Sequence, residues 1–351
     1  MATGSWSTLV DLASRQVNGK LVHIAEMLSQ TISFTEDLTF QEANGVTLHE
    51  GVYRTSMPPG VWRSYNQGTP YGKTTTAKFR LGVGNLVQWS QVDAKLAEDS
   101  GDVEGYRLRE DMGILQGMGQ TIEGTIIYGN PNVIPQEFYG LSAFYNSLNA
   151  DIATGGAQNG QNVLDAAGQG NSNLSIWLVG HSPRHFYGIY PRGSSAGLKM
   201  INRGDTVPAY DSVGNPFRAY TSMFEADMGI VPEDWRYIVR MANFDTTNAG
   251  LAGPNAPDIF AMMAQAAYLP ETFGKKQSGI TKTDSPSDSS PAIRFVWYAN
   301  RTARYHMDIQ AIRGRQVLLS MNDYDGRVTD SWRSIPVKVS DQLINYEARV
   351  N

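Results

Sequence analysis

Cysteine is absent from the 351-residue chain, which excludes disulfides, zinc–thiolate centres and a cysteine nucleophile. No apolar run approaches the roughly 18 residues of a membrane span, and the polar first residues carry no secretory signal. We therefore expect a protein without a membrane partner that stays in the cytosol or leaves by cell lysis. Basic residues are not in excess, and the net charge of −5 argues against a surface that grips nucleic acid along its length. Such a charge still permits the protein to enclose nucleic acid without binding it tightly.

The composition is that of a folded protein with many loops. Hydrophobic residues make up 41% of the chain and charged residues 18%, values that suit a globular protein better than a disordered one. The length allows roughly two domains of about 150 residues each. Glycine is frequent, with 35 residues and no repeat, which predicts many turns, bulges and irregular loops.

Two segments have the periodicity of amphipathic helices. In residues 8–32, apolar side chains recur at spacings of three to five. Two interpretations stay open there: a helix packed on its own domain, or an N-terminal arm laid across a neighbouring subunit. Residues 102–128 form the longest predicted helix, which Asp102 favours through the helix dipole and Asn130-Pro131 ends. Several internal glycines predict that other backbones approach this helix closely. Its narrow apolar stripe consists of Leu108, Met112, Leu115, Gly119, Ile122 and Ile126.

Two pairs of extended runs predict hairpins. Residues 217–228 and 235–244 flank a turn at Pro232-Glu233-Asp234. Residues 51–62 and 75–92 flank a polar tip at 63–74. The latter hairpin has so little apolar mass that it needs another surface, either from its own core or from another chain.

The remaining apolar runs predict short elements, whose order indicates an α+β fold rather than a wound βαβ sheet. The expected strands are 174–179, 186–190, 293–298, 317–321 and 335–339, with 342–350 extending the last one. The expected helices are 259–269 and 302–313, and the glycine-rich or polar breaks are 149–172, 246–257 and 273–291.

Two motifs resemble known chemical sites but fail in detail. Gly68–Thr74 resembles a phosphate-binding loop, yet it has three residues between its glycines where that loop has four, and no helix follows it. The sequence around Ser182 resembles a hydrolase nucleophile elbow. There, Arg184 replaces the required glycine, and Pro183 removes a backbone N–H that would bind the oxyanion.

Metal ligands are also poorly arranged. Among the five histidines, His181 and His185 are the pair close in sequence, and Pro183 forbids the helix that would place both on one face. Asp323 begins a run like that of a calcium loop, but the twelfth position is Ser334 and not a glutamate. The sequence therefore predicts no catalytic, cofactor-binding or metal site.

The strand-rich block from Asn173 to Asp245 carries a family resemblance. Its segments Asn173-Leu-Ser-Ile-Trp-Leu-Val-Gly180, Gly188-Ile-Tyr-Pro-Arg-Gly193 and Asp234-Trp-Arg-Tyr-Ile-Val-Arg240 resemble major capsid proteins of short-tailed, epsilon-fifteen-type bacteriophages. The chain length and the order of the predicted elements are similar to theirs as well, and the resemblance covers most of the chain.

This resemblance implies the Hong Kong 97-type capsid fold, which has an N-terminal arm, an extended hairpin loop, a peripheral domain with a long spine helix, and an axial domain near the capsomer centre. On this chain we expect the arm at 1–49, the extended loop at 50–93 and the spine helix at 102–128. The rest divides into a peripheral domain, 94–139, 173–245 and 322–351, and an axial domain, 140–172 and 246–321.

The implied function is that of a non-enzymatic shell subunit of the virion, assembled in the host bacterial cytoplasm. Hexamers and pentamers of it would form an icosahedral head that encloses double-stranded DNA without sequence-specific binding. The expected partners are scaffold, portal and cement or decoration proteins, and no cofactor is expected. Two alternatives stay open. One is an encapsulin-like nanocompartment of the same fold, which would hold protein cargo instead of DNA, and the other is a hydrolase that uses Ser182 and His185.

Overall fold

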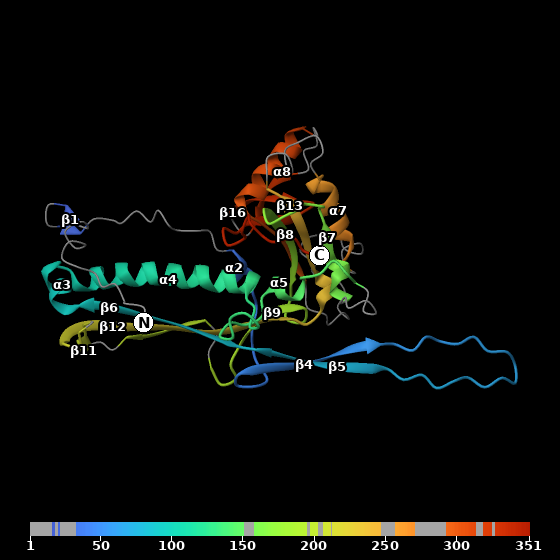
Figure 1. The fold of residues 1–351 in the computed structure, drawn as a ribbon, viewed down its shortest axis with the longest axis horizontal. Coiled ribbons are helices and arrows are strands. Elements are labelled where there is room, and N and C mark those ends of the chain that lie inside the picture. Colours follow the sequence, from blue (N-terminus) through green and yellow to red (C-terminus); the bar gives the residue numbers. More distant parts are fainter. Residues whose placement is uncertain are drawn as a thin grey trace.

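The computed structural model describes residues 33–150, 158–194, 197–202, 206–211, 213–246, 257–270, 293–313, 319–324 and 327–351, together with the strand residues 16–17 and 20–21. These residues form an α+β fold with two main sheets, a long helix and a protruding hairpin (Figure 1). The long helix and the sheet beside it extend to one side of the molecule, and the hairpin extends to the other. The second sheet, with two helices, stands above their junction. None of the described helices is both long enough and apolar enough to span a membrane.

The long helix α4, Val103–Tyr128, confirms the longest predicted helix. Asp102 caps its start, where the carboxylate Oδ1 accepts a hydrogen bond of 2.9 Å from the Gly105 N–H. The helix ends at Gly129, whose N–H donates to the carbonyl of Thr125 at 2.8 Å. A Cβ at Gly129 would clash with the carbonyl oxygen of Phe138. The chain can therefore turn back this sharply only where a glycine stands.

The sheet beside α4 is organised around one long strand, β12, Pro216–Pro232. On the face toward the helix, Phe224 and Ala226 of β12 pack against Met118 of α4. The first part of β12 pairs antiparallel with β6, Gly84–Asp93. The other strands of this sheet, among the described residues, are β3 (Phe40–Glu42), β9 (Phe186–Tyr190), β10 (Leu198–Asn202) and β11 (Val207–Tyr210).

The second sheet has, in the described part of the chain, the strand order β15-β16-β17-β14-β8-β13-β7. Its central strand β8, Asn173–His181, is buried on both faces. Ile176 faces the helices α7 and α8, whereas Trp177 faces the end of α4. The alternation of side chains along a strand thus joins two cores through one sheet. The other elements are β7 (Val163–Asp165), β13 (Ile238–Asp245), β14 (Arg294–Ala299), β15 (Leu319–Tyr324), β16 (Arg327–Trp332), β17 (Ile335–Val339), α7 (Ile259–Tyr268) and α8 (Arg301–Arg313).

The predicted hairpin around residues 63–74 is confirmed. Strands β4, Leu48–Ser56, and β5, Thr75–Gly82, pair antiparallel. The expected single run 75–92 is two strands, however, because the chain leaves β4 after Gly82 and continues as β6 along β12. The hairpin is therefore a separate two-stranded sheet, joined to the sheet beside α4 by the chain that continues from β5 into β6.

The second predicted hairpin is wrong. Although Pro232-Glu233-Asp234 does end one strand, β12 and β13 belong to different sheets. Pro232 lies opposite Phe186, and Ile238 lies opposite Val179. The short helix η3, Trp235–Tyr237, carries the chain from one sheet to the other.

Two terminal predictions also fail where the structure describes them. Within the expected helix 8–32, β1 (Gln16–Val17) pairs antiparallel with β2 (Lys20–Leu21), so no helix runs through these residues, and the rest of the segment lies outside the described residues. Residues 342–350 do not extend β17. They cross the second sheet with a single bridge, from Glu347 to Asn173.

The other short elements mostly lie where expected. The breaks predicted at 246–257 and 273–291 fall almost entirely outside the described residues. The break predicted at 149–172 is interrupted by a 3₁₀ turn, η2 (Gln158–Asn162), and by β7. Sheet pairing also joins segments that the expected domain division separates, because β14 lies between β8 and β17.

Candidate assembly surfaces

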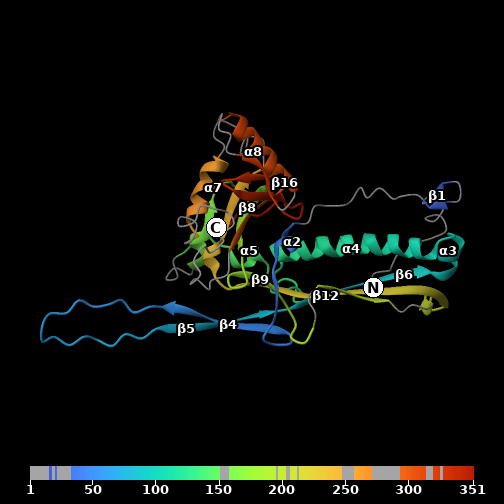
Figure 2. The same ribbon diagram turned by 180° about the vertical axis from the view of Figure 1, so that it is seen from behind.

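The hairpin exposes large aromatic side chains. Beyond the pair Ser56 and Thr75, residues 57–74 continue without regular strand pairing to the tip, well away from the rest of the chain (Figures 1 and 2). Trp62, Tyr65 and Tyr71 are each at least 97% exposed. Aromatic rings dominate the energetics of protein interfaces, and large apolar groups gathered on a surface mark interaction sites. The tip is therefore a candidate contact with another molecule.

The part of the hairpin beyond Glu50 carries charge of one sign. Residues 51–80 contain five basic residues and no acidic residue, so this segment has a charge of +5. Since the whole chain carries −5, the remainder carries −10. A second copy of the chain thus offers the hairpin a body of opposite charge. The five residues are Arg54, Arg63, Lys73, Lys78 and Arg80.

The base of the hairpin is fixed to the sheet beside α4. Leu81 of β5 is buried against Ile189 and Val231. His49 of β4 lies with its Nε2 3.3 Å from the hydroxyl of Tyr187. This anchoring at one end directs an otherwise unsupported ribbon outward.

Helix α4 exposes part of its predicted apolar stripe. Leu108 is 62% and Met112 55% exposed, so this part of the predicted stripe does not face a core of the same chain. The helix instead turns Tyr106 toward the sheet. The stripe meets a core near the helix end, where Ile126 is fully buried. Gly113 has open space where its side chain would be, so no backbone among the described residues approaches it closely. The exposed stripe is a second candidate contact surface.

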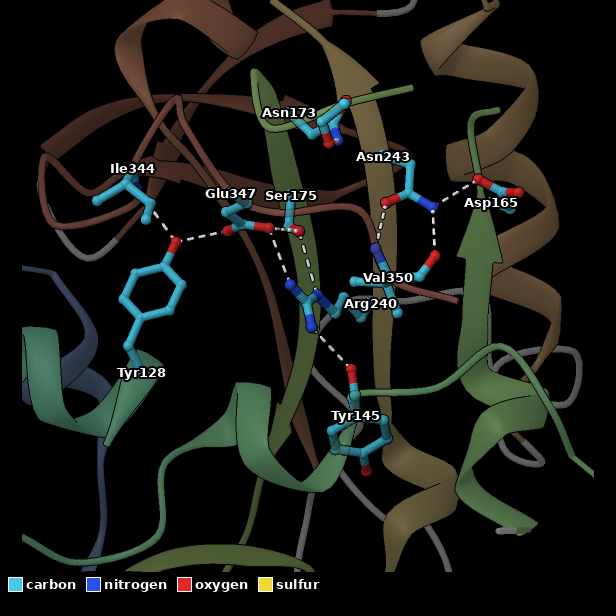
Figure 3. A network of polar contacts seen from close by, with 11 residues as sticks. Tyr128, Tyr145, Asp165, Asn173, Ser175, Arg240, Asn243, Ile344, Glu347 and Val350 are labelled. Atoms are coloured by element: carbon cyan, nitrogen blue, oxygen red, sulfur yellow. Dashed lines mark hydrogen bonds and ion pairs between the residues drawn. The ribbon is translucent and has the colours of Figure 1, made fainter. Parts of the chain in front are cut away.

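A buried polar network holds α4 to the second sheet (Figure 3). The guanidinium of Arg240, on β13, is 2.8 Å from the carboxylate of Glu347, and each side chain is 5% exposed. Arg240 also donates to Ser175 Oγ at 3.1 Å and to the carbonyl of Tyr145 at 2.7 Å. The Tyr128 hydroxyl, in the last turn of α4, donates to Glu347 at 2.5 Å. The Arg240–Glu347 ion pair thus receives further hydrogen bonds from several elements, as a buried pair of charges requires.

The C-terminal segment is tied down beside this network. The side chain of Asn243 donates to the Val350 carbonyl at 3.0 Å and accepts from the Val350 N–H at 2.9 Å. Burial, followed by the nearby charge of Glu347, raises the pKa of Tyr128 well above its usual value, which keeps the phenol a hydrogen-bond donor. The helix end, the second sheet and the C-terminal segment are therefore held together by hydrogen bonds as well as by a shared apolar core.

This architecture is shared with known phage proteins. A family model described as major capsid protein GP7 matches residues 16–351. The chain belongs to this major capsid protein family. A chain in the solved structure of bacteriophage Epsilon15 is 26% identical, with a TM-score of 0.74, over 100% of this chain and 99% of its own. A chain of the bacteriophage JBD30 capsid is 11% identical, with a TM-score of 0.51, over 97% and 100%, which shows the fold alone. No curated protein sequence matches significantly.

The capsid protein therefore has the Hong Kong 97-type fold and serves as a structural subunit of the virion, not as an enzyme. This fits the surroundings of Ser182, which is buried. Its hydroxyl accepts a long hydrogen bond, 3.5 Å, from the Arg184 N–H. The neighbouring imidazoles have other partners: His181 Nε2 is 2.8 Å from the Tyr298 hydroxyl, and the His185 ring packs edge-on against Tyr237. Burial lowers the pKa of His181 to about 4.

Changing Ser182 to Ala is expected to leave the capsid protein functional. The substitution removes one long hydrogen bond, so the free energy of unfolding should fall by no more than about 1 kcal/mol. Denaturant unfolding and electron microscopy of assembled particles would measure both effects. Loss of particle formation by a variant of normal stability would show a role for the hydroxyl that its contacts do not explain.

The other two motifs lie in the hairpin and in a strand pair of the second sheet. The Gly68–Thr74 segment lies at the hairpin tip, and the strand β5, not a helix, follows it. Asp323 lies in β15, which pairs antiparallel with β16, and residues 325 and 326 of that run lie outside the described residues. Among the residues that the structure describes, no three histidine, aspartate or glutamate side chains are grouped to hold a metal ion.

Proposed function

We propose that this capsid protein assembles into hexamers and pentamers that close into an icosahedral head around double-stranded DNA. Membership of the capsid family supports this, and so does the hairpin, which is the observation that carries the proposal. A ribbon with exposed aromatic rings and a charge of +5 finds little apolar surface on its own subunit. Repeated contacts between copies supply that surface and close by symmetry.

The hairpin tip docks on a neighbouring subunit. Its aromatic rings lose their exposure to water there, and its basic side chains meet the negatively charged body of the neighbour. The exposed stripe of α4 at Leu108 and Met112 is covered by a second such contact. Stability of the shell then comes from large areas summed over many subunits.

Sheet membership supports a revised division into domains. The arm and the hairpin keep their expected places, and α4 with β6, β10, β11 and β12 forms the peripheral domain. The axial domain comprises the second sheet with α7 and α8, and therefore takes β8, β13 and the C-terminal strands β16 and β17.

Assembly takes place in the host bacterial cytoplasm, with a scaffold and a portal protein and, outside, a cement or decoration protein. The excess of negative charge outside the hairpin suits a wall that confines DNA without holding it, because like charges repel. No sequence-specific contact with DNA is needed.

Negative-stain microscopy of the full-length protein, expressed with and without a scaffold, tests this function. Closed shells are expected, and particles from infected cells should contain DNA. Raising the salt concentration during assembly should slow it, because charge attraction between the hairpin and a neighbour is screened. A protein that stays monomeric with its scaffold would contradict the proposal, and shells filled with protein cargo would replace it with a nanocompartment.

A further inference from the structure

The segment that leads from residues 1–32 into the fold is held by two buried carboxylates. We call residues 33–38 the arm root. On one side, Glu123 of α4 accepts hydrogen bonds from the backbone N–H groups of Ser33, at 2.7 Å, and Phe34, at 3.3 Å. On the other side, the arm root supplies its own carboxylate, Asp37, which accepts from the Tyr298 hydroxyl at 2.6 Å. The arm root is thus clamped between the long helix and the second sheet.

The two carboxylates have different electrostatic surroundings. Asp37 lies 2.9 Å from the Arg294 guanidinium and 2.9 Å from the Lys338 ammonium, so its negative charge is balanced. Glu123 is completely buried, and its hydrogen bonds join uncharged groups: the two backbone N–H groups and the hydroxyl of Ser340. A buried carboxylate without a cationic partner is costly when it is charged.

Charged and titratable groups near Glu123 come from each element packed around it. The short helix α2, Phe34–Asp37, contributes Glu36, which repels a negative charge on Glu123, and Asp37. From the second sheet come Lys338, whose contacts are with Glu36 and Asp37, and the Tyr298 phenol. These groups leave the Glu123 carboxyl without a direct balancing cation.

The uncharged carboxylic acid fits the same contacts. Oε2 accepts from both backbone N–H groups in either protonation state, since a carbonyl oxygen has two lone pairs. Oε1 contacts the Ser340 hydroxyl, which accepts a hydrogen bond from a protonated carboxyl as readily as it donates one to a carboxylate. The geometry therefore keeps every hydrogen bond when the proton is present.

We propose that Glu123 is a proton-controlled anchor of the arm root: its uncharged form holds residues 33–38 tightly between α4 and the second sheet, and loss of the proton loosens them. With such an anchor, the strength with which residues 1–32 are attached to the subunit depends on pH, while the rest of the fold does not change. The inference concerns the single subunit and does not depend on shell assembly.

The direction of the effect follows from linkage. Burial raises the pKa of Glu123 from 4.5 to about 7 in the folded subunit. A raised pKa means that the folded form binds the proton more tightly, so the anchor is strongest below about pH 4.5. It weakens as the pH rises to about 7, and stays weak above that. Across this window the opening of the arm root is expected to increase by roughly 100-fold.

Hydrogen exchange of the full-length, unassembled protein tests this anchor. Protection of the Ser33 and Phe34 amides, corrected for the intrinsic effect of pH on exchange, should fall by roughly 100-fold between pH 4.5 and 7.5. Glu123→Gln mimics the uncharged acid and should keep the high protection at every pH. The matched control Glu104→Gln, at an exposed position of the same helix, should behave as the wild type.

Amides of the buried strand segment 174–179 report global unfolding and should stay better protected than the arm root at every pH, because opening of the arm root is local. Wild-type protection at the arm root that does not change with pH would overturn the proposal. So would a pH dependence in Glu123→Gln equal to that of the wild type. Both measurements are made on the single subunit, so their outcome does not depend on whether the protein assembles into shells.

Discussion

Deleting residues 57–74 and joining β4 to β5 with an Asn-Gly turn is expected to abolish shell assembly while leaving a folded subunit. The deleted residues lie outside both cores, and the remaining strands end at the pair Ser56 and Thr75, where a two-residue turn closes a hairpin. The subunit loses the aromatic tip and two of the five positive charges in residues 51–80. Circular dichroism would show the fold, and sedimentation velocity would show the absence of shells.

A milder variant separates side-chain contacts from hairpin length. Replacing Trp62, Tyr65 and Tyr71 together by Ala keeps the backbone, and truncation of an aromatic anchor costs about 2 kcal/mol or more at an interface. The critical concentration for assembly should therefore rise at least about 100-fold. Gln67→Ala, also at the exposed tip, is the matched control and should assemble normally. Normal assembly of the triple variant would show that the aromatic rings of the tip do not contribute to subunit contacts.

Replacing Arg240 by Met is expected to destabilise the subunit by about 3–5 kcal/mol, because it leaves the buried carboxylate of Glu347 without its cationic partner. The Ser175 and Tyr128 hydroxyls would still contact Glu347, but they carry no charge. The free energy of unfolding from urea titration would measure the loss. The slope of that free energy with urea concentration should not change.

Two further variants show whether the loss comes from an unpaired buried charge. Arg240→Met combined with Glu347→Gln removes both charges, and should recover part of the lost stability. Arg80→Met breaks the pair with Glu50, in which the Arg80 side chain is 71% exposed, and should cost about 1 kcal/mol or less. Equal losses for Arg240→Met and Arg80→Met would show that the buried network does not hold the domains together.

Local signals in the sequence were sufficient for some elements and misleading for others. Helix α4 was predictable because Asp102 and its apolar spacing mark a helix in any context. The partners of β12 and β13 were not predictable, because strand pairing depends on contacts between segments that are distant in sequence. Ile238 pairs with Val179, and the polar turn before it serves equally well as a passage between sheets.

Local sequence signals also do not reveal what the contact surfaces bind. The spacing of Leu108 and Met112 correctly indicates an apolar stripe, but spacing cannot tell whether a stripe faces its own chain or another one. The all-positive hairpin was visible in the sequence as a segment without Asp or Glu, and was missed. Arg240 also left a signal, since it is a lone charge within an apolar run, and Glu123 is the single charged residue between Asp111 and Glu137. Their partners, however, come from segments far away in the chain.

A particle reconstruction of shells formed by the full-length protein tests the central claim most directly. We predict closed icosahedral shells in which residues 57–74 of each subunit lie on a neighbouring copy, with Trp62, Tyr65 and Tyr71 buried in that contact. Shells in which the hairpin projects freely or folds back onto its own subunit would contradict this account of assembly.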